Sequence, residues 1–118
     1  MATRRGSAAN DTLTGGSPVD TLPGLAGHDR LRGLASNDRL DGGLGNDILD
    51  GGAGNDTLSG AAGDDTLSGG AGDDILLAGT GANALSGADG NDRLTGDSGN
   101  DALDGGSGAD ILELSGTV

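Results

Sequence analysis

Leucine occupies every ninth position along most of the chain, and an aspartate stands two residues before nearly every one of these leucines. The pattern is clearest from residue 42 onward, where GGLGNDILD, GGAGNDTLS, GAAGDDTLS and GGAGDDILL follow one another without an insertion. A fixed period of this kind indicates a repeat architecture. In such proteins each unit buries its apolar residue only by stacking on copies of itself.

The same frame extends over residues 6–113 and gives twelve nonapeptides, with leucine at position 8 in all of them. Position 6 is aspartate in eleven units, the exception being Asn83. The last three residues of a unit, such as Thr57-Leu58-Ser59, predict a short strand with the leucine inward. The first six, G-G-x-G-x-D in the best copies, predict a turn, because glycine permits positive φ. Helix is disfavoured by the recurrent glycine and by the absence of a 3.6-residue period.

Two units form one coil of 18 residues, with a strand on each side and a turn at each edge. Twelve units give six coils, which at the usual strand spacing would stack over about 29 Å. The predicted fold is therefore all-β: a right-handed parallel β-roll, that is, a two-sheet β-solenoid of about six 18-residue coils. We expect residues 1–5 to be a disordered leader, residues 6–113 to form the roll, and residues 114–118 to be a tail.

Composition limits what can hold this roll together. The chain has no Phe, Trp, Tyr or Cys, and 27 of its 118 residues are glycine, so its interior must be thin. Nineteen acidic residues against six basic ones leave a net charge of -13, which repels a compact state. The aspartates are in phase with the glycines, which solubility alone would not require. A hard multivalent cation, Ca²⁺ above all, is the counterpart that this pattern favours.

Stacking of the coils would place aspartates two units apart next to each other, as with Asp47 and Asp65 or Asp56 and Asp74. Two carboxylates at a strand spacing repel each other, and a divalent cation between them would convert that repulsion into coordination. Ca²⁺ takes six to eight oxygens, more than two aspartates supply. Glycine-rich turns can provide the remaining ligands, because their backbone carbonyls can turn toward the ion.

These units resemble the G-G-x-G-x-D-x-U-x nonapeptides of RTX (repeats-in-toxin) proteins, which bind Ca²⁺ in a parallel β-roll. The resemblance covers residues 6–113. It implies a secreted, extracellular module that folds when it binds Ca²⁺ and serves as a structural or folding element of its parent protein. The implied metal ligands are the position-6 side chains, with backbone carbonyls of the turns: Asp29, Asp38, Asp47, Asp56, Asp65, Asp74, Asp92, Asp101 and Asp110, with weaker contributions from Asp11, Asp20 and Asn83.

Departures from the motif predict unequal sites. Units one and two carry Ser7-Ala8-Ala9 and Pro18, and unit four carries Ser36 at a glycine position, so we expect the N-terminal sites to be weak or empty. Asn83 offers an amide in place of a carboxylate and should weaken the sites that it shares with Asp65 and Asp101. Six turns on each edge enclose five gaps, so at most ten ions could lie between coils, and we expect roughly six to eight.

Other functions find little support in the sequence. There is no HExxH motif and no Cys or Lys, and the single histidine, His28, is expected to be a solvated loop residue, so we predict no enzyme activity. The negative charge disfavours nucleic acid, and no apolar run is long enough to insert into a membrane. Arg32 is expected to form a surface pair with Asp50, one coil away. Ile48, Ile75, Leu77 and Ile111 are expected to be outward apolar residues.

Three alternatives remain open from the sequence. The chain could be an excised or engineered repeat array, because neither end carries a recognisable cap, and its coils could associate end to end. It could carry an ice-binding or adhesive surface on the same scaffold, although the outward positions are too mixed for a regular row. It could also be an acidic disordered spacer with diffuse ion binding. A circular dichroism titration with Ca²⁺ distinguishes the spacer from the roll.

Overall fold

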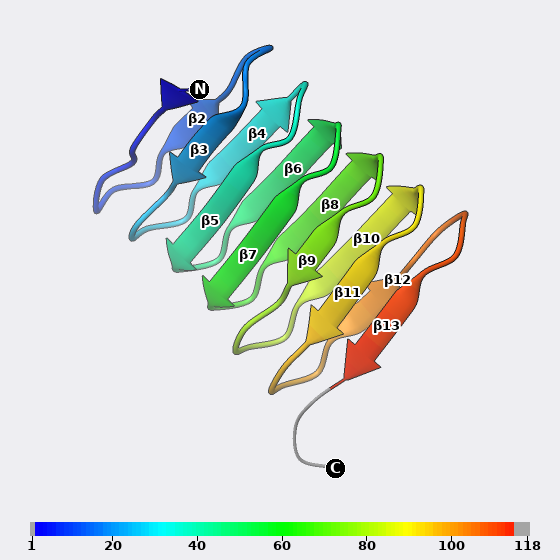
Figure 1. The fold of residues 1–118 in the computed structure, drawn as a ribbon. Helices are drawn as coiled ribbons and strands as arrows, with labels where there is room; N and C mark the ends of the chain where they lie inside the picture. The colour runs from blue at the N-terminus through cyan, green and yellow to red at the C-terminus, as the bar shows by residue number, and fades with distance from the viewer. Residues whose placement is uncertain (1, 115–118) are drawn as a thin grey trace.

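The computed structural model describes residues 2–114, and within them the chain forms thirteen strands in two parallel sheets (Figure 1). The chain passes from one sheet to the other at every turn, so neighbouring strands within a sheet are two strands apart in sequence. Paired residues are 18 positions apart, as in Leu40 with Leu58 and Leu49 with Leu67. The predicted all-β solenoid of 18-residue coils is confirmed.

The seven-stranded sheet has the order β1-β3-β5-β7-β9-β11-β13, and the six-stranded sheet has the order β12-β10-β8-β6-β4-β2. Figure 1 shows the two sheets face to face, with strands running in opposite directions in the two layers. The first sheet contains β1 (Ala2–Thr3), β3 (Asp20–Pro23), β5 (Arg39–Leu44), β7 (Thr57–Ala62), β9 (Ile75–Leu77), β11 (Arg93–Gly96) and β13 (Ile111–Leu114). The second contains β2 (Thr12–Thr14), β4 (Arg30–Leu34), β6 (Ile48–Ala53), β8 (Thr66–Ala71), β10 (Ala84–Asp89) and β12 (Ala102–Asp104).

The core is one layer of leucine side chains between the sheets, as the position-8 pattern predicts. Nine of these leucines are at most 3 % exposed, and Leu13 and Leu103 near the two ends pack against them partly buried. Leu112 in the last strand is 47 % exposed, which differs from the expected inward position, because no further coil covers it within the described residues. The buried leucines are Leu22, Leu31, Leu40, Leu49, Leu58, Leu67, Leu76, Leu85 and Leu94.

The strands in the middle of the roll are longer than the sequence predicts. β6 and β8 each cover six residues, and their pairing continues past the leucine to Gly52 with Gly70 and Ala53 with Ala71. Positions 1 to 3 of a unit therefore continue the strand of the unit before it, and the turn proper is only positions 4 to 6. Positive φ is required at positions 2 and 4, as at Gly70 (φ 97°) and Gly72 (φ 116°).

The N-terminal end also differs from expectation. Ala2 and Thr3 form β1, which pairs with Asp20 and Thr21 of β3, so the expected disordered leader contains an ordered strand. The N–H group of Arg4 continues this pairing by donating to the Thr21 carbonyl at 3.1 Å. The first residue and most of the predicted tail, residues 115–118, lie outside the described residues.

Outward residues follow the predicted rows. Ile48, Ile75, Leu77 and Ile111 are 47, 43, 38 and 55 % exposed. Arg32 lies beside Asp50 in the register of the six-stranded sheet, but among the described residues their charged groups do not form the expected ion pair. Arg93 and Glu113 form an ion pair at 2.9 Å, which the repeat pattern does not predict.

Candidate metal centre

The position-6 aspartates form one ladder along each edge of the roll. On one edge, the backbone N–H of Asp29 donates to Asp47 Oδ1 at 2.7 Å, and the N–H of Asp47 donates to Asp65 Oδ1 at 2.8 Å. On the other edge, the N–H of Asp56 donates to Asp74 Oδ1 at 2.8 Å. Each carboxylate thus uses one oxygen to join its own coil to the preceding one. The structure brings together the pairs that the sequence placed two units apart.

The second carboxylate oxygen of these residues is buried and has no hydrogen-bond partner. A buried polar atom without a partner is costly, because the group has lost its water and gained nothing in return. Such a row of orphaned anionic oxygens is the observation that a bound cation would explain. The orphaned atoms are Oδ2 of Asp29, Asp38, Asp47, Asp56, Asp65, Asp74, Asp92 and Asp101.

The orphaned oxygen faces the first glycine of its own unit. A Cβ atom built on Gly51 would lie 2.5 Å from Asp56 Oδ2 and 2.7 Å from the carbonyl oxygen of Gly69, one coil further on. Gly60 repeats the arrangement with Asp65 Oδ2 at 2.5 Å and the carbonyl of Ala78 at 2.7 Å. A carboxylate of one coil and a carbonyl of the next therefore converge where a side chain is missing. This donor set consists of hard oxygens, which suit Ca²⁺.

Backbone groups must supply much of any coordination shell. Within residues 2–114, no three side chains of the His, Cys, Asp or Glu type gather closely enough to hold a metal ion. Each of the eight turns with an orphaned Oδ2 instead offers that carboxylate oxygen together with nearby backbone carbonyl groups. A site built in this way would require adjacent coils to be stacked, because its oxygens come from two of them.

Burial makes the carboxylates hard to ionise without a cation. Desolvation raises the pKa of Asp56 to about 6 and the pKa of Asp65 to about 7. The hydrogen bond from the Asp47 N–H opposes the rise at Asp65, and the negative charge of Asp47 adds to it. Desolvation likewise raises the pKa of Asp74 to about 7. The pKa values of Asp38, Asp47 and Asp92 are also raised, chiefly by burial.

The predicted ligands at the N-terminal end have a different environment. Asp20 Oδ2 accepts a hydrogen bond from the Gly16 N–H at 2.6 Å. Asp11 Oδ2 accepts from the N–H of Ser7 at 2.6 Å and from its hydroxyl at 2.9 Å. These two carboxylates are satisfied within their own turns. The structure thus separates units one and two from units three to eight. Unit four, which was also expected to be weak because of Ser36, keeps an orphaned Asp38 Oδ2 like its neighbours.

The three remaining predicted positions are less regular. Asp101 is partly buried, but it is the last position-6 residue along its edge of the roll. Asp110 is also partly exposed, and its Oδ1 accepts from the N–H of Asp92 at 2.8 Å. Asn83 is 3 % exposed and accepts from the N–H of Asp65 through Oδ1 at 2.7 Å. Asn83 therefore keeps the ladder but brings no second carboxylate oxygen.

A second ladder, formed by position 5, was not recognised in the sequence. The N–H of Asp64 donates to Asn46 Oδ1 at 2.9 Å, and the N–H of Asn91 donates to Asp73 Oδ1 at 2.9 Å. Here the side chain belongs to the earlier coil, opposite to the position-6 ladder. His28 belongs to it, because its Nδ1 accepts from the Asn46 N–H at 2.8 Å. The frequent Asn and Asp at position 5 were the available signal.

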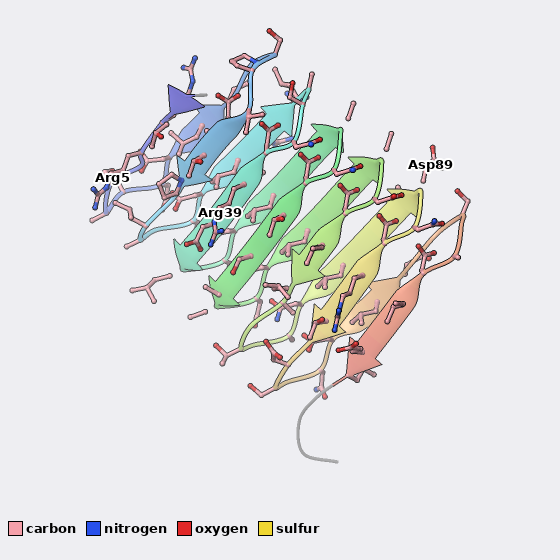
Figure 2. The ribbon with its side chains drawn as sticks, viewed as in Figure 1. Arg5, Arg39 and Asp89 are labelled. Atoms are coloured by element: carbon pink, nitrogen blue, oxygen red, sulfur yellow. The ribbon has the colours of Figure 1, made fainter. Side chains whose placement is uncertain are left out.

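Most charged side chains outside these ladders are exposed on the surface. Figure 2 shows Asp89 at the turn edge where β10 ends and Arg39 on the outer side of β5. The Ser107 hydroxyl donates to Asp89 Oδ1 at 3.0 Å, so position 3 also links neighbouring coils near the C-terminal end.

None of the described residues lies in a helix long and apolar enough to span a membrane.

Comparison with known families agrees with this geometry. The family described as RTX calcium-binding nonapeptide repeat matches four stretches of the chain, residues 5–22, 23–58, 50–85 and 77–112. Together these stretches cover most of the sequence. A search of curated proteins found no match. The repeat period, the parallel two-sheet fold and the family match lead to one assignment: the chain belongs to the RTX calcium-binding nonapeptide repeat family.

Proposed function

We propose that this calcium-binding repeat module folds when Ca²⁺ enters the turns between successive coils, and that it serves as a structural and folding element of a secreted protein. The row of buried, unpartnered Oδ2 atoms carries the proposal. Without ions these atoms are desolvated anions with raised pKa values, as at Asp65 and Asp74. A cation at each turn supplies the missing partner and removes the repulsion along the ladder.

Seven ions follow from the arrangement of coils. Eight position-6 aspartates have an orphaned Oδ2, but within residues 2–114 no coil lies beyond that of Asp101 to complete its turn, which leaves seven. The proposed ligands are the Oδ2 atoms of Asp29, Asp38, Asp47, Asp56, Asp65, Asp74 and Asp92, with carbonyls of the same and the next coil. The Oδ2 atoms of Asp11 and Asp20 already accept hydrogen bonds within their own turns, so both residues are proposed as weak sites. Asp110, in the last described coil, is proposed as a weak site as well.

Weak individual sites are sufficient for this role. At a tenfold excess of free Ca²⁺ over the dissociation constant, one site stabilises the fold by about 1.4 kcal/mol. Seven such sites together contribute roughly 10 kcal/mol, which is comparable to the net stability of a whole domain. A thin leucine core supported in this way would fold in calcium-rich surroundings outside the cell and stay unfolded where Ca²⁺ is scarce.

The test is a titration of the full chain followed by circular dichroism and by calorimetry. Millimolar Ca²⁺ should produce a cooperative change from coil to β-structure with about seven ions bound, and a chelator should reverse it. Mg²⁺ is the control, because it requires a smaller octahedral site and should act more weakly. A flat titration, or a folded chain in excess chelator, would show that the acidic spacer or an ion-independent roll is the better description.

The outer faces give no support to an ice-binding function. The row on the six-stranded sheet, read through its register, is Thr12, Arg30, Ile48, Thr66, Ala84 and Ala102. Such a surface has no regular spacing of hydroxyl or amide groups, and we do not propose this function.

End-to-end self-association remains a proposal. Among the described residues, β12 and β13 are the outermost strands at the C-terminal side of their sheets, and Leu112 and Leu114 are 47 and 73 % exposed. Open parallel edges can pair with another chain. Sedimentation velocity at increasing protein concentration, with Ca²⁺ present, tests this. A constant sedimentation coefficient over the whole range would contradict the proposal.

A further inference from the structure

Unit nine, residues 78–86, departs from the repeat at positions 1 and 6. In the other units the residues at these two positions face each other. Position 1 is Ala78 instead of glycine, and position 6 is Asn83 instead of aspartate. Ala78 is completely buried and Asn83 is 3 % exposed, so neither difference is a surface variation. The strand here is also short: β9 ends at Leu77, whereas β7 before it in the same sheet runs for six residues.

The hydrogen bond from the Asp65 N–H fixes the orientation of the Asn83 amide. Oδ1 of Asn83 accepts this bond at 2.7 Å, as the aspartates do in the other coils. The other end of the amide is therefore the NH₂ group, which donates to the Gly81 carbonyl at 3.4 Å. Where other turns present an anionic oxygen, this turn presents a donor. An NH₂ group cannot coordinate a cation, and here it also engages a turn carbonyl.

The methyl group of Ala78 excludes the arrangement found in the other turns. At Gly42 and Gly51, a Cβ atom would lie 2.5 Å from the Oδ2 atom of the aspartate in the same unit, which is closer than carbon and oxygen can approach. A carboxylate held as in those turns therefore cannot coexist with alanine at position 1. The two replacements in unit nine affect the same site, since each removes part of the same set of oxygen ligands.

We propose that residues 78–83 form a metal-free turn, closed by the Ala78 methyl and the Asn83 amide, which interrupts the ion row on its edge. The inference rests on the proposed function of the other turns. The interruption affects only one of the two gaps between unit nine and its neighbouring coils. Asp65 keeps its orphaned Oδ2, and the Ala78 carbonyl still lies 2.7 Å from the Cβ position built on Gly60. Only the gap between Asn83 and Asp101 loses its ion.

The decisive experiment restores the motif in the full chain and counts ions by calorimetry at saturating Ca²⁺. The double variant A78G/N83D should bind one more Ca²⁺ than the wild type. N83D alone should bind no additional ion, because its new carboxylate meets the Ala78 methyl. The charge-matched control is N91D. It places an aspartate at an exposed position 5, which Asp64 and Asp73 already occupy in other units, and it should leave the number of bound ions unchanged.

The reverse exchange keeps the inference testable if a restored carboxylate prevents folding. G60A/D65N transfers the unit-nine pair to unit seven and should remove one ion while circular dichroism still shows the β-roll. Its control, D64N, loses the same charge at an exposed position and should keep the wild-type count. A double variant A78G/N83D with an unchanged count, an extra ion in N83D alone, or an undiminished count in G60A/D65N would overturn the inference. A wild-type chain that binds no Ca²⁺ would instead overturn the proposed function.

Discussion

Asp65 Oδ1 accepts a hydrogen bond of 2.8 Å from the backbone N–H of Asp47, while Asp65 Oδ2, in the same carboxylate, is buried without a partner. The two oxygens therefore have different roles. One joins successive coils by accepting from a backbone N–H, and the other is available to a cation. A substitution that keeps the first role and removes the second can separate folding contacts from ion binding.

Asp74→Asn is such a substitution. The asparagine Oδ1 can still accept from the Asp56 N–H, which the native carboxylate does at 2.8 Å. The orphaned oxygen is lost, so we expect one ion fewer and about 1.4 kcal/mol less stabilisation at tenfold excess Ca²⁺. Calorimetry and a Ca²⁺-dependent folding curve measure both quantities. Asp73→Asn removes the same charge at an exposed neighbour and is the control. Equal ion counts in the two variants would argue against Asp74 as a ligand.

The pH dependence of the ion-free chain should be the reverse of that of an ordinary salt-bridged protein. Burial raises the pKa of Asp65 and Asp74 to about 7, from an ordinary value of 3.8, so the folded chain binds protons more tightly than the unfolded chain. Protonation therefore stabilises the ion-free fold. This stabilisation is complete below about pH 4 and is lost as the pH rises through about 7.

Circular dichroism in calcium-depleted buffer should accordingly show more β-structure at pH 4 than at pH 8. Protons should also compete with the ion, so the apparent Ca²⁺ affinity should fall between pH 8 and pH 5. The variant D65N/D74N lacks two of the titrating carboxyls and should respond less to pH. An ion-free spectrum that is the same at pH 4 and pH 8 would be incompatible with these raised pKa values.

Alanine at position 4 of a turn should be worse than alanine at position 2. Gly72 has φ 116° and Gly70 has φ 97°. Among the positive-φ residues, position 2 holds a side chain in four units (Leu25, Leu34, Ala61 and Ala88), whereas position 4 holds one only at Ser36 (φ 80°). Gly72→Ala should therefore add strain of about 1 to 3 kcal/mol and raise the Ca²⁺ concentration needed for folding. Gly70→Ala is the matched control and should cause a smaller shift. An equal shift in both variants would contradict this difference.

The leucine layer should contribute independently of the ions. Leu58 is completely buried in the middle of the roll, so Leu58→Ala should destabilise the fold by about 2 to 5 kcal/mol. Ile48→Ala, at a position that is 47 % exposed, should change the free energy of unfolding by less than about 0.5 kcal/mol. Urea denaturation at saturating Ca²⁺ compares the two. A similar loss in both would mean that the leucines are not the core on which stability depends.

The sequence by itself was sufficient for the period, the two-sheet solenoid, the inward leucines and the two edges of aspartates. These follow from an unbroken nine-residue spacing, because leucines 18 residues apart, such as Leu40 and Leu58, can be buried only if coils stack in register. The family resemblance and its link to Ca²⁺ were equally visible from G-G-x-G-x-D. Spacing could also identify Asn83 as an exception in its edge.

Only the tertiary structure decided how each turn uses its atoms. Whether Asp20 Oδ2 is orphaned or bonded to the Gly16 N–H depends on the local turn conformation, which spacing does not encode. The meaning of Ala78 likewise required the position of the facing carboxylate in neighbouring turns. The β1 strand at Ala2 and Thr3 lies outside the repeat and forms because an open sheet edge offers it hydrogen bonds. A one-dimensional period fixes which residues become neighbours, whereas rotamers and backbone angles fix which of their atoms meet.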